Sequence, residues 1–201
     1  GFKIFKLNHC YLRSKNIQNF KIIKINKNNK KNFVKKIKKK VEIQNVSSVE
    51  EIINLKKNKK IWNNFQPMKS SQYLISRYMK HPIYNYDLNF IIKNNKKIAI
   101  VVSREINFKK RKIIKIVDYF GSNCSVKYLS NFCEKMFLDN NLELIEFYNY
   151  GIDIKILKSI GFNTTINKKE IIPRYFEPFI KKNIEVFGGI LNFGKFKNIR
   201  V

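Results

Sequence analysis

The sequence predicts an α+β fold with a mixed, mostly antiparallel sheet flanked by helices. Three strand-like runs between residues 88 and 119 are joined by short polar turns, which is typical of an antiparallel meander. After Gly121 the apolar spacing changes to three and four residues, which indicates a helix, and a further strand follows. Because a strand–helix–strand order implies a right-handed crossover, the sheet is expected to be mixed.

Length and composition indicate one folded domain and exclude a disordered or membrane-spanning chain. The 201 residues are 44% apolar and 14% aromatic, and no apolar run approaches the roughly 20 residues that span a bilayer. The start, Gly1-Phe2-Lys3, has no initiator Met and no signal-peptide core, so we expect the chain to begin inside a longer protein. The three Cys lack disulfide or zinc spacing, which favours a cytoplasmic location and no metal.

The net charge of +28 favours nucleic acid or an anionic membrane as a partner. Only six of the 42 basic residues are Arg, and 27 Asn with a single Ala indicate an A/T-rich genome, which explains part of the charge. Residues 1–41 hold 14 Lys or Arg and no acid, whereas residues 118–177 hold seven basic and eight acidic residues. Nucleic-acid binding by the N-terminal segment is therefore an alternative that we do not favour, and the basic run at 35–40 is interpreted as a solvated surface.

The first 86 residues predict two strands and two helices. Weak alternation favours short strands at 2–7 and 20–25. A serine pair at 47–48 followed by two Glu predicts a helix that runs to about residue 55. A second serine pair at 70–71 opens another helix, which ends before Pro82.

The rest of the chain has clearer patterns. Asn94-Asn95 suits a tight hairpin turn, because Asn tolerates positive φ, and Gly161 suits the position after a helix. The expected elements are strands at 88–93, 97–105, 112–119 and 142–148, helices at 125–138 and 152–160, and strands near 171–172 and 185–187.

This order of elements resembles the GNAT acyltransferase fold over residues 46–190. In that family the sheet splays apart between its fourth and fifth strands, acyl-CoA enters the gap, and backbone N–H groups at a glycine-rich turn hold the pyrophosphate. Gly121 matches the middle glycine of the family pattern Q/R-x-x-G-x-G/A, with Asp118 and Asn123 at its two ends. The resemblance implies that acetyl-CoA or another acyl-CoA binds as a substrate at Tyr119, Phe120, Gly121, Ser122 and Asn123.

A second GNAT signature is Y-x-x-x-G-F at the end of the last helix, where the Tyr protonates the leaving thiolate. This chain keeps Gly161-Phe162 and has Leu157 at the position of the Tyr. Tyr148 or Tyr150, at the end of the preceding strand, is the candidate that replaces it. The alternative for either ring is packing of its body with a solvated hydroxyl.

Residues 67–86 look like GNAT-like proteins found in bacterial surface-polysaccharide gene clusters. That resemblance implies an amino sugar or nucleotide sugar as acceptor, bound over Arg77, His81 and Tyr84. Arg and Tyr side chains suit a sugar phosphate or carboxylate. The alternative for His81 is a structural corner at the end of a helix.

The N-terminus is similar to the Gly161-Phe162 region, since it also begins with Gly-Phe. This similarity predicts that the basic segment 1–45 is the end of a preceding GNAT-like lobe, with a GNAT-like domain over 46–201.

Acyl transfer to an amine needs a base for the amine proton, or a path for that proton to solvent. Asp118 and Glu105 are expected at strand ends near the glycine turn, and alternation places Asp118 on the face of the isoleucines two and four positions before it. The alternative for either acid is an ion pair with Lys or a turn cap. Glu146 lies in an otherwise apolar strand and is interpreted as an exposed side chain or as a base. His9 has no partner that the sequence reveals.

The sequence therefore predicts an acyltransferase that moves an acyl group, expected to be acetyl, from acyl-CoA to an amine or hydroxyl of a small-molecule acceptor. Asp118 or Glu105 is the expected base and Tyr148 the expected acid. A non-catalytic GNAT-fold module that has lost CoA binding and a basic nucleic-acid-binding protein stay as alternatives, and a homodimer is also open.

Overall fold

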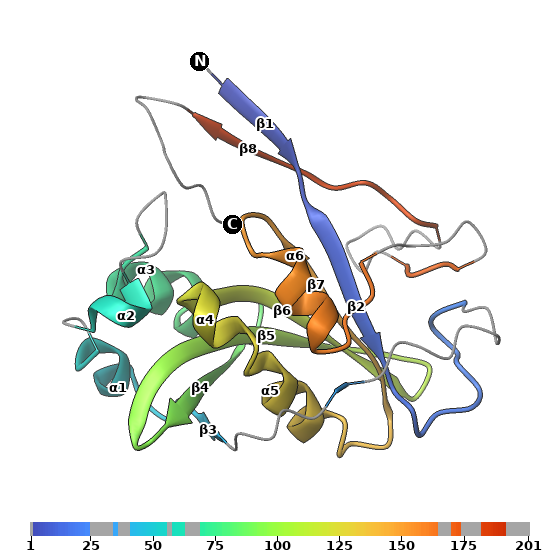
Figure 1. Cartoon of the computed structure of the whole chain (residues 1–201), viewed down its shortest axis with the longest axis horizontal. Helices are drawn as coiled ribbons and strands as arrows, with labels where there is room; N and C mark the ends of the chain where they lie inside the picture. The colour runs from blue at the N-terminus through green and yellow to red at the C-terminus, as the bar shows by residue number, and fades with distance from the viewer. Residues whose placement is uncertain are drawn as a thin grey trace.

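A six-stranded sheet in the order β2-β7-β6-β5-β4-β3 forms the body of the protein, and a separate ribbon pairs β1 with β8 (Figure 1). The structure is a computed structural model and describes residues 2–24, 34–35, 41–55, 58–62, 69–164, 170–173 and 182–191. The strands are β1 (Phe2–Lys6), β2 (Asn8–Arg13), β3 (Glu42–Asn45), β4 (Asp87–Lys93), β5 (Lys96–Phe108), β6 (Arg111–Gly121), β7 (Leu142–Asn149) and β8 (Phe187–Leu191).

Short helices flank the sheet, which confirms the predicted α+β class. Ser48 caps α1 and Ser70 caps α3, as the two serine pairs predict, and α3 continues directly into the π-helical turn η1. The single helix expected at 125–138 is divided into α4 and α5. The helices are α1 (Val49–Ile53), α2 (Lys59–Trp62), α3 (Ser71–Leu74), η1 (Ile75–Met79), α4 (Asn123–Val126), α5 (Leu129–Met136) and α6 (Ile154–Ser159).

The central meander forms as predicted, with one strand longer than expected. Asn94 and Asn95 have φ of 48° and 56°, which is the left-handed conformation that a tight hairpin turn requires. The next turn places Lys109 and Lys110 at φ of 48° and 62°. Because β5 continues to Phe108, the predicted end of this strand at residue 105 is wrong.

β6 and β7 are the parallel pair of this otherwise antiparallel sheet. Their register runs from Lys112 opposite Leu142 to Ile116 opposite Phe147. Beyond that point β6 continues to Gly121 and β7 to Asn149 with no further pairs between the two strands. The sheet therefore opens between the far ends of β6 and β7.

A bulge in β6 decides which face of the sheet Asp118 occupies. Val102 of β5 pairs with Asp118, but the following residue of β5 pairs with Ile116, so Val117 is the extra residue. Simple alternation would place Asp118 beside Ile116, on the face that α5 covers. The extra residue turns it to the opposite face, beside Val102, so the sequence-based prediction of its face is wrong.

Both faces of the sheet are covered, by different elements. One face packs against α4, α5 and α6 through residues such as Val126, Phe132 and Leu157. The opposite face carries two apolar clusters: one under α1–η1, and one under residues 17–24 and 170–173. Between these two clusters β5, β6 and β7 present charged side chains. Lys115 of β6 lies on this face between Ile113 and Val117, and it pairs with Arg104 of β5 and Glu146 of β7.

The N-terminal residues join the main sheet. β2 is an edge strand beside β7, so the sheet includes strands from both sides of the boundary expected at residue 45. The strand expected at 20–25 is wrong over its described part, where Lys24 forms an isolated bridge with Ile171. Residues 36–40 of the basic run and residues 67–68 of the expected acceptor segment lie outside the described residues. No helix of the described part is long and apolar enough to cross a membrane.

Candidate functional site

The glycine turn lies at the β6 end of the opening. A Cβ on Gly121 would lie 2.8 Å from the Ala99 Cβ and 2.9 Å from the Ser125 Oγ, so only glycine fits there. Ser122 precedes α4 at its N-cap, and Asn123 begins that helix with an exposed side chain.

Tyr119 and Phe120, which the resemblance assigned to acyl-CoA binding, are core residues. The Tyr119 hydroxyl donates to the Ser125 Oγ at 2.7 Å on the α5 face. The Phe120 ring lies on the opposite face, 5.6 Å from the Trp62 ring. Of the five predicted residues, Ser122 and Asn123 have side chains that reach solvent beside the Gly121 backbone.

Asp118 is buried and saturated with hydrogen-bond donors. Lys69 Nζ contacts both carboxylate oxygens at 2.8 and 2.9 Å, the Tyr78 hydroxyl donates at 2.9 Å, and the Tyr119 backbone N–H donates at 2.8 Å. Burial and the Asp118 charge raise the pKa of the Tyr78 hydroxyl, which keeps it protonated as a donor. The carboxylate thus joins the helical segment to β6 and has no lone pair directed at a substrate.

Glu105 is far from the opening, which corrects its expected place near Gly121. It pairs with Ile114 in the ladder, six residues along β5 from the Ala99–Gly121 pair, or about 20 Å. Its side chain is exposed and contacts Lys112 Nζ at 3.2 Å. Glu105 therefore forms a surface ion pair and cannot act on a substrate in the opening.

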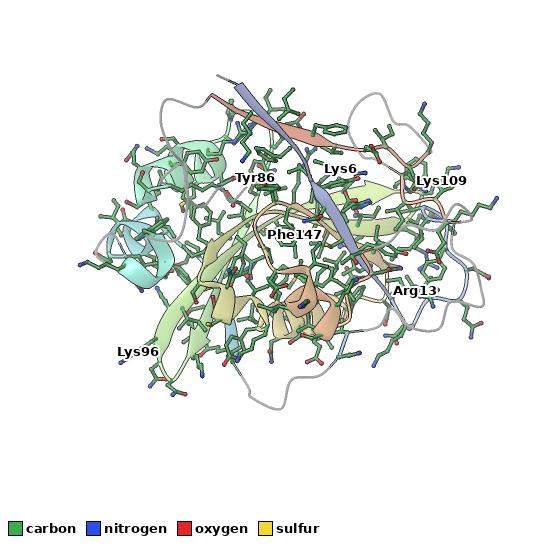
Figure 2. The ribbon with its side chains drawn as sticks, turned by 45° about the horizontal axis from the view of Figure 1, so that its top comes forward. Lys6, Arg13, Tyr86, Lys96, Lys109 and Phe147 are labelled. Atoms are coloured by element: carbon green, nitrogen blue, oxygen red, sulfur yellow. The ribbon has the colours of Figure 1, made fainter. Side chains whose placement is uncertain are left out.

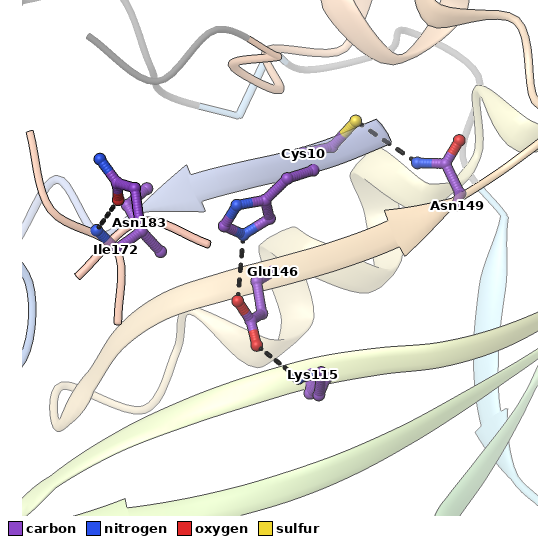
Figure 3. A network of polar contacts seen from close by, with 7 residues as sticks. Cys10, Lys115, Glu146, Asn149, Ile172 and Asn183 are labelled. Atoms are coloured by element: carbon purple, nitrogen blue, oxygen red, sulfur yellow. Dashed lines mark hydrogen bonds and ion pairs between the residues drawn. The ribbon is translucent and has the colours of Figure 1, made fainter. Parts of the chain in front are cut away.

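Tyr148, the expected acid, lies directly beyond the last β6–β7 pair and meets His9 of β2. The two rings are stacked, with centroids 4.1 Å apart and an interplanar angle of 7°. The His9 Nε2 lies 3.1 Å from the Glu146 Oε2, and the Glu146 Oε1 lies 3.0 Å from Lys115 Nζ (Figure 3). The neighbouring strands β2, β7 and β6 thus bring His9, Glu146 and Lys115 together.

Glu146 is ionised in this network although it is fully buried. Burial disfavours the charged carboxylate, but the hydrogen bond from His9 and the Lys115 charge outweigh burial and lower its pKa. Because a carboxylate only accepts, the His9 Nε2 carries the proton of this hydrogen bond. The interpretation of Glu146 as an exposed side chain is therefore wrong.

A pocket of about 480 Å³ adjoins this network. His9 and Tyr148 line it, together with residues of the β1–β2 junction and of the segment before β8. The two side chains are therefore accessible to a small molecule, whereas Glu146 and Lys115 lie behind them in the sheet.

The expected acceptor residues separate into two groups. His81 and Tyr84 line a second pocket of about 240 Å³ beside the start of β4, whereas Arg77 is exposed on η1 and is not among its lining residues. The His81 Nδ1 accepts the backbone N–H groups of Ile83 and Tyr84 at 3.2 and 3.0 Å, so this ring holds the corner after η1. The structural alternative for His81 is thus confirmed.

A row of charged side chains lies between Tyr84, which lines one pocket, and His9, which lines the other. We use "polar row" for Arg104, Lys115 and Glu146, which are in register on β5, β6 and β7. The Arg104 guanidinium lies 3.7 Å from the centroid of the Tyr84 ring, and Glu146 contacts His9 at the other end.

Sequence reasoning did not find His9, Lys115 or Arg104. Lys115 and Glu146 share one signal, a charged residue with an apolar residue on each side within a strand. Pairing them, however, requires the β6–β7 register, and His9 is 137 positions from Glu146 along the chain. No group of three or more potential metal ligands occurs among the described residues.

No family model and no curated protein matches this chain. Nine chains of solved structures do match. One of them is a functionally unknown conserved protein from Staphylococcus epidermidis ATCC 12228, with a TM-score of 0.50, 16% identity and coverage of 82% of this chain. Our chain spans 60% of the length of that protein. At this identity the likeness concerns the fold alone, and it supports the α+β class.

Proposed function

We propose that this protein transfers an acyl group from acyl-CoA to an amine or hydroxyl group of a small-molecule acceptor. The observation that carries the proposal is the opening between β6 and β7, which begins after the Ile116–Phe147 pair. On one side of it β6 bulges and ends in a glycine turn that leads into α4. This is the arrangement that the GNAT resemblance implies for an acyl-CoA site.

The glycine turn fits the phosphate end of such a donor. The first backbone N–H groups of a helix have no partner within the helix, and here they belong to Asn123 and Cys124, whose side chains are exposed. The absence of a side chain at Gly121 lets the turn pack closely against Ala99 and Ser125, which positions the start of α4.

His9 and Tyr148 supply the proton chemistry of the transfer. The acceptor nitrogen or oxygen forms a bond with the acyl carbon as the carbon–sulfur bond breaks, and the acceptor proton passes to the His9 Nδ1. The leaving thiolate takes a proton from the Tyr148 hydroxyl. Glu146 orients the imidazole and stabilises its protonated form, and therefore acts as a positioning residue.

A non-catalytic module is the second candidate, and one position favours it. Leu157 stands where the GNAT signature has its acidic Tyr, and its side chain is fully buried in the core. The His9–Glu146 network argues against it, because a buried ion pair contributes little net stability to a fold and carboxylates with a shifted pKa cluster at functional sites.

Acetyl-CoA and free CoA are expected to raise the melting temperature of the protein. Ligand at 100 times its dissociation constant stabilises a fold by about 2.7 kcal/mol. The measurement is a thermal-shift titration at two salt concentrations, with polyphosphate as the control for binding through the charge of +28. Asn123→Asp, which puts a negative charge at the glycine turn, is expected to weaken the shift, whereas Asn140→Asp on an exposed turn is not. A shift that polyphosphate reproduces and salt abolishes would remove the basis for acyl-CoA binding.

His9→Gln is expected to slow the transfer about 100-fold, the lower end of what a general base contributes. The measurement is the release of CoA thiol from acetyl-CoA in the presence of a panel of amines, amino sugars and sugar alcohols. Glu146→Gln is expected to slow the same reaction, because the amide no longer stabilises the protonated imidazole. A His9→Gln variant that is folded and turns over at the wild-type rate would exclude His9 as the base.

A further inference from the structure

We infer that Arg104 forms an anion-binding site in the polar row, and that the acceptor carries a carboxylate or phosphate group that binds there. The identity of the ligand as an acceptor rests on the proposed acyl transfer. The anion site itself rests on the contacts of Arg104 and is tested without an acyl donor.

The Arg104 side chain is partly buried, and its contact with Tyr84 orients the guanidinium. Its guanidinium lies over the Tyr84 ring, 3.7 Å from the centroid, so the stack occupies its flat face. The N–H donors of a guanidinium lie in its plane and stay available for a bidentate contact. Among the described residues no carboxylate forms an ion pair with Arg104, although the planar fork matches a carboxylate or phosphate.

The Tyr84 ring is itself held in place, which reduces the entropy that binding would lose. Its backbone N–H donates to the His81 Nδ1 at 3.0 Å, and the His81 ring stacks on the Tyr84 ring at 5.1 Å. His81 and Tyr84, expected from the sequence to contact the acceptor, are therefore positioning residues for Arg104.

The polar row holds two positive charges and one negative charge. Arg104 and Lys115 are directly opposite each other in the β5–β6 ladder, which places their Cβ atoms about 5 Å apart. Like charges at that position destabilise a sheet. Glu146 pairs with Lys115, so an anion at Arg104 would neutralise the remaining charge of the row.

The position of Arg104 suits an acceptor whose reacting group points at His9. Arg104 and His9 are three strands apart, or about 14 Å across the sheet. Tyr84, at one end of the row, lines the 240 Å³ pocket, and His9, at the other, lines the 480 Å³ pocket. A molecule with an anionic group at one end and an amine or hydroxyl several atoms away would reach both, as in a sugar phosphate or a sugar acid.

The test is titration calorimetry at fixed ionic strength with three sugars: glucose 1-phosphate, glucuronate and uncharged glucose. We expect one of the two charged sugars to bind more tightly than glucose. Tighter binding of glucose 1-phosphate would identify the anion as a phosphate, and tighter binding of glucuronate would identify it as a carboxylate. Arg104→Gln is expected to weaken that binding about tenfold or more. Arg104→Lys keeps the charge but loses the fork, and is expected to weaken it as well.

The control is Lys96→Gln, which removes one positive charge from the exposed start of the same strand (Figure 2). Its affinity is expected to stay within about twofold of wild type, since it lies eight residues, or about 26 Å, from Arg104. Equal affinities of Arg104→Gln and Lys96→Gln would overturn the site, and Arg104→Lys decides the case if Arg104→Gln does not fold. Binding that depends on Arg104 in a protein that does not bind CoA would refute the acyl transfer and leave the anion site intact.

Discussion

Replacing Asp118 with asparagine is expected to lower the free energy of unfolding by about 3–5 kcal/mol, the usual loss when one partner of a buried ion pair is removed. Lys69 and Asp118 have side chains only 10% and 5% exposed, and their contact is 2.8 Å. The variant keeps the shape of the side chain but leaves the Lys69 ammonium without its carboxylate. Urea unfolding at pH 7 measures the change.

Glu105→Gln is the matched control for this experiment, because it also converts a carboxylate to an amide. Its side chain is 38% exposed and contacts the partly exposed Lys112, so a loss of at most about 1 kcal/mol is expected. Similar losses for the two variants would show that the Asp118 ion pair does not stabilise the fold. Tyr78→Phe should fall between them at about 2 kcal/mol, since it removes one hydrogen bond to the charged Asp118 carboxylate.

Glu146→Gln is expected to lower the free energy of unfolding at pH 7 by about 3–5 kcal/mol, as Asp118→Asn does. The difference in stability from wild type should disappear in acid. Removing this carboxylate leaves Lys115 buried beside a neutral amide. The folded-state pKa of Glu146 is lowered below its ordinary value of 4.5. A lowered pKa contributes stability above the unfolded-state value, and this contribution is lost as the pH falls through the folded-state pKa.

Denaturant unfolding of wild type and Glu146→Gln from pH 7 down to pH 3 measures this difference. We expect it to be constant above about pH 5 and to decrease steadily below that. Glu42→Gln on the exposed edge strand β3 is the control for the loss of one negative charge from a strongly basic chain. A difference that does not change with pH, or that Glu42→Gln reproduces, would contradict the ionised state assigned to Glu146.

The local elements were predictable because their signals are local. Asn94-Asn95 forms its turn through the tolerance of Asn for positive φ, and Ser48 and Ser70 cap their helices through short-range hydrogen bonds. Gly121 was found for the same reason, as an isolated glycine between a strand and a helix. The longer β5 was missed because Lys109 and Lys110 adopt turn conformations that Asn and Gly adopt far more often.

The candidate site was only partly predictable. Tyr148 was placed correctly at the end of its strand, which the structure puts beside the opening. Its partner His9 comes from β2, a strand that the sequence did not reveal. Asp118 was expected to be a base or to pair with a Lys, and the structure shows the pair with Lys69 and a further donor from η1. Glu105 was misplaced because its strand continues past it.

The sequence by itself determined the fold class, the meander, the helix starts and the single position where only glycine fits. Each of these follows from the period of apolar residues or from the conformational preferences of one or two residues. Only the tertiary structure decided which charges meet. A bulge at Val117 moved Asp118 to the other face of the sheet, and the registers of three strands brought His9, Glu146 and Lys115 together. The physical reason is that strand pairing joins residues far apart in the chain, and one extra residue reverses the face of every side chain after it.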